Sequence, residues 1–169
     1  VRAALDHGRP VLCEKPLASS EGDAERMAKW ARESGRLCAV NFPYRALPAV
    51  ARLRALVADR RVRQVACTLH SSFAAQATDE SADFGGVSHL IDTALYLGGG
   101  DPVWVQAALS GRPVHSAALH IGLSSGALLV VNQIACSEPG TRGSWFVAAD
   151  GWEASFAGGY EPTRGGWCV

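Results

Sequence analysis

The sequence predicts a two-part fold, in which a short α/β layer precedes an α+β domain with a predominantly antiparallel sheet. Near the start, two short apolar runs alternate with helical patterns, which is typical of parallel strands joined by helices. After residue 101, candidate strands follow one another with short links, which is typical of antiparallel sheets. The 169 residues, 48% hydrophobic and 19% charged, suit one good core or two small domains.

The chain opens with the expected end of a helix and a short strand. Residues Val1–His7 fit the last turns of a helix, and Gly8 fits the left-handed residue that closes it. Val11–Cys13 is apolar without alternation, so we expect a short strand that is covered on both faces.

A second helix and strand follow. Ser20 is the expected N-cap, because Asp23 completes a Ser-x-x-Asp capping pattern. The helix should run to Ser34 and end at Gly35, before a buried strand at Leu37–Val40. Its expected buried stripe comprises Ala24, Met27, Ala28 and Ala31. We therefore interpret residues 1–43 as the last part, the C-terminal remnant, of a Rossmann-type nucleotide-binding domain.

The second domain is expected over residues 44–169. A helix is predicted over Pro48–Asp59, a strand with alternating apolar residues over Val62–His70, and an amphipathic helix over Gly85–Gly98. The stripe predicted for the first of these helices comprises Val50, Leu53, Leu56 and Val57. Further strands are expected over Val103–Leu109, Ser116–Leu123, Gly126–Cys136, Trp145–Ala149 and Trp152–Phe156, the last two joined at the turn Asp150-Gly151. Residues Glu161–Val169 have a composition typical of a poorly ordered segment.

Charge and cysteine content exclude several classes of protein. Lysine plus arginine equals aspartate plus glutamate, 16 of each, so nothing favours nucleic acid or a membrane surface as partner. The apolar runs are too short to span a bilayer. The five cysteines are widely spaced and form no Cys-x-x-Cys pair, which indicates reduced thiols in the cytoplasm and disfavours a zinc site.

The stretch Cys13-Glu14-Lys15-Pro16 stands where the first predicted strand ends. Ligands of open α/β sheets bind at the carboxyl ends of the strands, where a lysine can present its ammonium group to a hydroxyl or carbonyl oxygen. Pro16 favours an extended backbone at Lys15. The alternative is a surface Glu-Lys pair closed by a loop proline.

His89 and Asp92 lie one turn apart on the predicted helix Gly85–Gly98. His89 lies about 200° round the helix from Val87, and thus off the stripe that packs on the sheet. A histidine can accept or release a proton near neutral pH. The alternative is an exposed histidine with a solvated aspartate beside it.

The segment His7 to Ala18, around Glu14-Lys15-Pro16, resembles the Glu-Lys-Pro segment of the glucose-fructose oxidoreductase / inositol dehydrogenase / rhizopine catabolism (Gfo/Idh/MocA) family. The predicted helix Gly85–Gly98, with the pattern Gly-Gly…His-x-x-Asp…Tyr-Leu-x-Gly, also resembles a helix in the second domain of this family. Members are two-domain oxidoreductases that use NAD or NADP and act mostly on sugars and cyclitols.

The resemblance implies roles for individual residues. Lys15 would lie beside the nicotinamide and the reacting hydroxyl, with Glu14 and Pro16 in the same cofactor-binding segment. His89 would handle the proton, and Asp92 matches the acidic residue one turn later in the substrate site. Arg45 matches an arginine near the cofactor, where the alternative is a surface arginine at a domain junction.

Two departures from the family pattern limit what the resemblance implies. No Gly-x-Gly-x-x-Gly loop is present in the sequence, so we expect weak or no NAD or NADP binding by these 169 residues alone. We interpret the chain as an internal piece of a longer protein, truncated at both ends. Family members often carry an aspartate four residues before the histidine, where this chain has Gly85; either Asp83 replaces it in substrate binding or that carboxylate is lost.

The expected activity is hydride transfer between a CH–OH substrate and a nicotinamide. One alternative is a non-catalytic relative that acts as an oligomerisation or ligand-binding module, and another is a relative that acts on an imine or a dihydrodiol. The expected partners are a small-molecule substrate and, by the family resemblance, further copies of the chain that meet through the sheet of the second domain.

Overall fold

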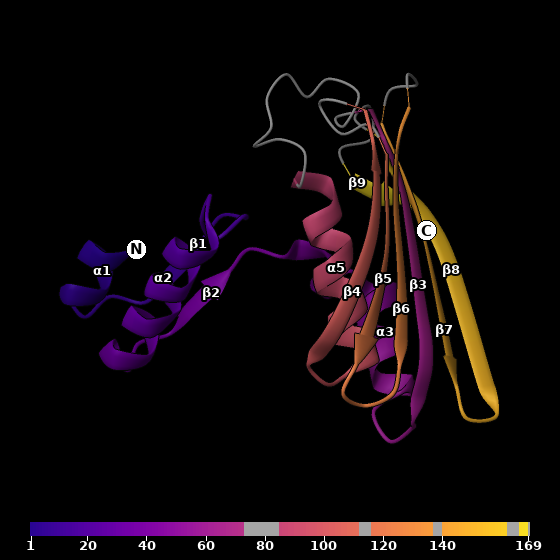
Figure 1. Cartoon of the computed structure of the whole chain (residues 1–169), viewed down its shortest axis with the longest axis horizontal. Helices are drawn as coiled ribbons and strands as arrows, with labels where there is room; N and C mark the ends of the chain where they lie inside the picture. Colours follow the sequence, from indigo (N-terminus) through magenta and orange to yellow (C-terminus); the bar gives the residue numbers. More distant parts are fainter. Residues whose placement is uncertain (73–84, 112–115, 137–139, 162–165, 169) are drawn as a thin grey trace. The chain divides into compact units, whose positions relative to one another are not determined.

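The computed structural model describes residues 1–72, 85–111, 116–136, 140–161 and 166–168. The chain forms two compact units, Val1–Phe42 and Pro43–Val169 (Figure 1). The predicted fold class is confirmed, since a parallel α/β piece is followed by an α+β unit with a mixed, mostly antiparallel sheet.

The first unit contains two helices and two strands. The strands pair in parallel, with Leu12 opposite Ala39. This pairing is the βαβ arrangement that the alternating apolar runs predict. The elements are α1 (Arg2–Asp6), β1 (Val11–Cys13), α2 (Glu21–Ser34) and β2 (Cys38–Val40).

The helix ends follow the predicted capping residues. The side chain of Ser20 accepts a hydrogen bond from the backbone N–H of Asp23 at 3.2 Å, which satisfies a donor in the first turn of α2. Gly35 ends α2 with a φ of 61°, a left-handed conformation that glycine adopts without a steric penalty.

The packing of this unit differs from the prediction. Leu12 is 71% exposed, so β1 is not covered on both faces, because the parallel sheet described here has two strands and buries little surface. The apolar stripe predicted for α2 lies on its less exposed side, but no residue of that helix is fully buried. Local sequence therefore predicted the elements correctly and overestimated how far they are covered.

The second unit is built on one mixed sheet. Its described strands are β3 (Val62–Ser71), β4 (Pro102–Ser110), β5 (Ser116–Leu123), β6 (Leu128–Ala135), β7 (Thr141–Ala149), β8 (Trp152–Glu161) and β9 (Gly166–Cys168). They lie in the order β4-β5-β6-β3-β7-β8-β9. Strand β3 pairs in parallel with β6, and the other neighbours are antiparallel.

The C-terminal strands correct one prediction. The hairpin at Asp150-Gly151 is confirmed, with Gly151 at a φ of 68°, although β8 extends to Glu161. Residues Gly166–Cys168, expected to be poorly ordered from composition, form β9 because they find backbone partners on β8.

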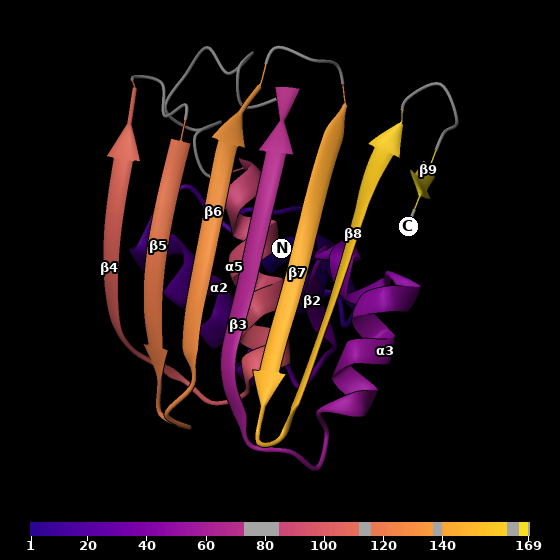
Figure 2. The same ribbon diagram turned by 90° about the vertical axis from the view of Figure 1, so that its right-hand side faces the viewer.

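In the described part of this unit, two helices cover one face of the sheet (Figure 2). They are α3 (Pro48–Leu56) and α5 (Gly85–Gly98), preceded by the 3₁₀ turn η1 (Pro43–Ala46). Helix α5 packs on β3 and β6. Of the stripe that its spacing predicts, Val87, Leu90 and Ala94 are fully buried, whereas Ile91 and Leu95 are only partly buried. Leu56, predicted to face the core, is partly exposed because it lies about 120° round α3 from Val50, at the edge of the stripe.

The core lies between these helices and the sheet. Alternate residues of β3 supply it, and Val65, Cys67 and Leu69 are buried as their alternation predicts. Trp145 of β7 is the largest fully buried side chain. The opposite face of the sheet is covered by no described helix.

Candidate functional site

The carboxyl ends of β1 and β2 are tied together. The side-chain Nδ2 of Asn41 donates to Oε1 of Glu14 at 2.8 Å, and the backbone N of Asn41 donates to the carbonyl of Cys13 at 2.7 Å. Lys15 and Pro16 follow directly, and Lys15 is half-buried. The predicted segment thus lies at the end of a parallel strand pair, where ligands of such sheets bind.

In the second unit, His89 is covered by the turn η1. The imidazole stacks on the ring of Tyr44, with centroids 4.8 Å apart and planes inclined by 23°. The periodicity of α5 placed His89 off the sheet-packing stripe, and the structure shows that the aromatic ring of Tyr44 lies against it. His89 is consequently half-buried rather than exposed.

Tyr44 is itself held in the core. Its ring meets Trp145 edge-on, with centroids 6.0 Å apart and planes at 81°, and Trp145 stacks on Phe156 at 4.6 Å. Burial raises the pKa of the Tyr44 hydroxyl to about 12, so the phenol stays neutral at physiological pH. An aromatic column therefore runs from β8 through β7 to His89.

Arg45, the next residue of η1, forms an ion pair with Asp92. Nε of Arg45 donates to Oδ2 of Asp92 at 2.7 Å, and Nη2 donates to Oδ1 at 2.5 Å. Both carboxylate oxygens thus accept from one guanidinium in a bidentate geometry. The hydrogen bond to Asp92 is the main cause that raises the pKa of Arg45.

Tyr96 extends this contact along α5. The guanidinium of Arg45 lies 4.9 Å from the centroid of the Tyr96 ring, and that of Arg54 lies 5.5 Å from it. Both distances suit cation–π contacts. The ion pair and the rings join η1, α3 and α5 in one cluster.

The predicted residues thus fall into two groups. Glu14, Lys15 and Pro16 belong to the unit Val1–Phe42, whereas Arg45, His89 and Asp92 belong to the other unit. The structure brings Arg45 and Asp92 together, and Asp83 lies outside the described residues.

Sequence patterns did not single out Asn41 and Tyr44. Asn41 faces the Glu-Lys-Pro segment only because β1 and β2 pair in parallel. Tyr44 reaches His89 only because η1 packs on α5. No local spacing connects either residue with its partner.

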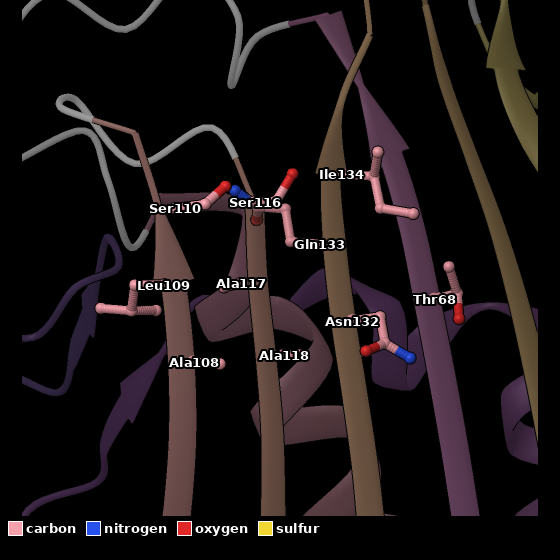
Figure 3. Close-up of a pocket in the computed structure, with 10 residues that line it drawn as sticks. All are labelled: Thr68, Ala108, Leu109, Ser110, Ser116, Ala117, Ala118, Asn132, Gln133 and Ile134. Atoms are coloured by element: carbon pink, nitrogen blue, oxygen red, sulfur yellow. The ribbon is translucent and has the colours of Figure 1, made fainter.

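A cavity of about 400 Å³ lies on the sheet around the row Ala108, Ala118, Asn132 and Thr68, which are neighbours across β4, β5, β6 and β3 (Figure 3). These residues alternate with core residues, so they belong to the face opposite α5. Its floor is formed largely by small side chains. This cavity is therefore separate from the cluster around His89.

Within the described ranges, no group of three or more His, Cys, Asp and Glu side chains is arranged to hold a metal ion. None of the described helices has the length and apolar character needed to cross a membrane.

Comparison with known proteins identifies the first unit. Residues 1–42 match the model of the oxidoreductase family with an NAD-binding Rossmann fold, GFO_IDH_MocA. A 73-residue stretch is 37% identical to D-xylose 1-dehydrogenase (NADP(+)) 2 of Haloferax volcanii, and covers 43% of this chain and 22% of that protein. The predicted family resemblance is thereby confirmed, and the matching family model describes an NAD-binding fold.

Solved structures match nearly the whole chain in fold. A probable dehydrogenase from Thermotoga maritima aligns with a TM-score of 0.81 and 19% identity, over 93% of this chain and 52% of its own. GenD2 from gentamicin A biosynthesis, solved in complex with NAD, aligns with a TM-score of 0.77 and 23% identity, over 92% of this chain and 49% of its own. A putative myo-inositol dehydrogenase from Sinorhizobium meliloti 1021 aligns with a TM-score of 0.77 and 18% identity, over 91% of this chain and 52% of its own. The chain thus spans about half the length of these proteins.

Proposed function

We propose, from its kinship with the Gfo/Idh/MocA oxidoreductases, that this chain is part of an NAD(P)-dependent dehydrogenase that oxidises a CH–OH group of a sugar, cyclitol or similar polyol. The observation that carries the proposal is the match of residues 1–42 to the family model, which includes the Glu-Lys-Pro segment at the end of β1. The names of the similar xylose and inositol dehydrogenases favour a polyol substrate.

The residues at the end of β1 fit one part of a nicotinamide cofactor. The hydrogen bond between Asn41 and Glu14 fixes the edge at which Lys15 stands, and an ammonium group there suits an electron-rich oxygen. The glycine loop that binds a pyrophosphate is not in this sequence, so Glu14, Lys15, Pro16 and Arg45 would hold only part of the cofactor.

The proposed reaction divides between the cofactor and two side chains. A nicotinamide, when bound, would supply the hydride acceptor for the substrate carbon. The substrate hydroxyl loses its proton to Nε2 of His89, because Nδ1 is enclosed, and the C–O bond becomes a carbonyl. Lys15 orients and polarises the same oxygen. Asp83 and Asp92 are the carboxylates proposed for the substrate site, in which Asp92 acts while paired with Arg45.

The test uses the complete reading frame that contains this chain, with NAD⁺ and NADP⁺ and a panel of aldoses and inositols. His89→Ala and Lys15→Ala should each lower kcat by about 100-fold or more, as expected for a lost proton acceptor or orienting group. Matched controls are His7→Ala, an exposed residue at the end of α1, and Lys29→Ala on α2, which should change kcat less than about twofold. Full activity of His89→Ala would rule out its assigned role.

We also propose that a second copy covers the open face of the sheet. Without the three-residue strand β9, the remaining strands of the sheet are spaced by about 4.8 Å and carry about four rows of outward side chains about 7 Å apart. They offer about 800 Å², the area that each partner of a standard interface contributes. Apolar residues such as Val130, Phe146 and Trp104 lie on this face among mostly small and uncharged residues, with Arg142 and Glu153 as charged exceptions. The same face would also join copies of the chain if the protein were the non-catalytic oligomerisation module considered above.

The oligomeric state provides the test of the second proposal. Val130→Glu, in the middle of the face, should turn a dimer or larger assembly into monomers in sedimentation experiments, because it introduces a charge that burial would leave unpaired. Ala51→Glu on the exposed side of α3 is the matched control and should leave the assembly unchanged. A monomeric parent chain at micromolar concentration would contradict this proposal. We also propose, from the wide spacing of the five cysteines, that the protein acts in the cytoplasm.

A further inference from the structure

The turn η1 presents two consecutive side chains to helix α5, and each contacts one of the two candidate site residues there. Tyr44 stacks on His89, and Arg45 binds Asp92 through two hydrogen bonds. His89 and Asp92 are three residues apart and share one side of α5. A single turn of backbone therefore contacts both members of the pair.

Tyr44 is a rigid support. It is 9% exposed, and the edge of its ring meets Trp145, which is 1% exposed. Trp145 is in turn stacked on Phe156, with planes only 11° apart. Because Trp145 and Phe156 belong to the sheet, the ring of Tyr44 has little freedom to rotate. The stacked imidazole of His89 is therefore held nearly parallel to it.

A histidine needs such a support for proton transfer. The torsion that sets the plane of an imidazole ring has a broad, shallow profile, so the side chain alone does not fix the direction of its nitrogen atoms. Proton transfer requires the accepting nitrogen to be within hydrogen-bond distance and aligned with the O–H bond. A stacked neighbour restricts the ring to one plane without occupying either nitrogen.

The ion pair restrains the backbone below the ring. Asp92 is almost fully buried and accepts hydrogen bonds from Arg45 with both oxygens, so the turn of α5 that carries His89 is held to η1 at a second point. The bidentate geometry fixes orientation as well as distance, which a lysine could not do.

We propose that Tyr44 and Arg45 are positioning residues for the proton-transfer step: Tyr44 sets the plane of the His89 ring, and Arg45 fixes the helix turn beneath it through Asp92. The inference deepens the proposed function, because it rests on His89 as the proton acceptor. It assigns Arg45 a positioning role in addition to the cofactor contact predicted from the sequence.

The first experiment separates stacking from bulk. In the complete reading frame, Tyr44→Leu keeps an apolar side chain and removes the aromatic ring, whereas Tyr44→Phe keeps the ring. We expect Tyr44→Leu to lower kcat by about 10-fold or more with little change in KM, and Tyr44→Phe to retain at least half of the parent kcat. Trp152→Leu, which removes an aromatic residue that contacts Arg60 rather than His89, is the control for general loss of packing.

A second readout requires no activity. In the 169-residue chain, the ring protons of His89 should show an upfield NMR shift from the stacked ring of Tyr44, which should persist in Tyr44→Phe and disappear in Tyr44→Leu. An unchanged His89 spectrum in folded Tyr44→Leu would overturn the proposal, even if that variant were less active or less stable. Full activity of His89→Ala would instead refute the proposed function. The NMR result would then still show whether Tyr44 orients the ring of His89.

The role of Arg45 is tested by its effect on kcat and on the KM for the cofactor. A positioning role predicts that Arg45→Met and Arg45→Lys both lower kcat by about 5-fold or more, in addition to any rise in the cofactor KM from the lost cofactor contact. A change confined to the cofactor KM would show direct cofactor binding and overturn the positioning role. An unchanged kcat would overturn it as well.

Discussion

Arg45 and Asp92, 47 residues apart in sequence, form a bidentate ion pair that joins η1 to α5. Asp92 is 8% exposed, while about half of the Arg45 side chain remains accessible to solvent. The carboxylate is therefore removed from water and depends on this arginine for compensation. Loss of the arginine should cost more than the loss of an ordinary surface ion pair.

Arg45→Ala should lower the unfolding free energy by about 2–3 kcal/mol, because it leaves a buried carboxylate without its charged partner. Arg63 provides the matched control, since it pairs with Asp150 at 2.5 Å while both side chains are more than half exposed. Arg63→Ala should cost less than about 1 kcal/mol. Urea denaturation followed by tryptophan fluorescence measures both values.

The same pair can be examined by a double-mutant cycle. Asp92→Asn removes the charge, and the further change Arg45→Ala in that background should then cost clearly less than in the parent chain. Equal costs in the two backgrounds would show that the ion pair does not stabilise the fold.

The hydroxyl of Tyr44 should ionise only at strongly alkaline pH. Burial raises the pKa of its hydroxyl to about 12, compared with a usual value near 10. An alkaline titration followed at the tyrosinate absorbance should therefore show a component with a midpoint well above pH 11. Tyr44→Phe should remove that component, and its persistence would assign it to another tyrosine.

Stability should decline at alkaline pH. Burial raises the pKa of the Cys67 thiol, like that of the Tyr44 hydroxyl, to about 12. Between about pH 9 and 12, the unfolded chain loses these protons while the folded chain retains them. The stabilising contribution of both groups is therefore complete below pH 9 and is lost as the pH rises, at up to about 1.4 kcal/mol per pH unit for each group. Chemical denaturation at a series of pH values measures the slope, which Tyr44→Phe should reduce.

Cys67 should resist alkylation in the folded protein. Its side chain is fully buried in β3 and its raised pKa leaves almost no thiolate at pH 8, whereas Cys13 and Cys38 are only half-buried. Iodoacetamide labelling followed by peptide mass spectrometry should modify Cys13 and Cys38 at least about 100-fold faster than Cys67. In denaturant the difference should disappear, and similar rates in the native protein would contradict the buried position of Cys67.

Gly86→Ala should destabilise α5, although alanine is the better helix former. A Cβ atom at this position would clash with Oε1 of Gln133, whose side chain is almost fully buried and cannot withdraw into solvent. We expect a loss of about 1–3 kcal/mol from this overpacking. Gly22→Ala on α2, where the nearest atom is 3.8 Å away, should instead be neutral or stabilising by up to about 1 kcal/mol. Thermal unfolding of the two variants tests this difference in sign.

Local signals in the sequence were sufficient for most elements. The Ser20 cap, the left-handed Gly35 and the spacing of Val87, Leu90 and Ala94 predicted helix positions that the structure reproduces closely. These signals work because capping and periodicity involve residues within one or two turns of each other. They overestimated burial at Leu12, because exposure depends on which other layers cover a strand.

The sequence by itself therefore determined the order of helices and strands, the presence of a Glu-Lys-Pro segment after β1 and the His-x-x-Asp pair on α5. Only the tertiary structure decided that Tyr44 lies against His89 and that Arg45 binds Asp92. Both contacts join residues more than 40 positions apart. They form because α5 packs on β3 and η1 packs on α5. Periodicity within one element contains no information about such partners, so the environment of the candidate proton acceptor could be established only in three dimensions.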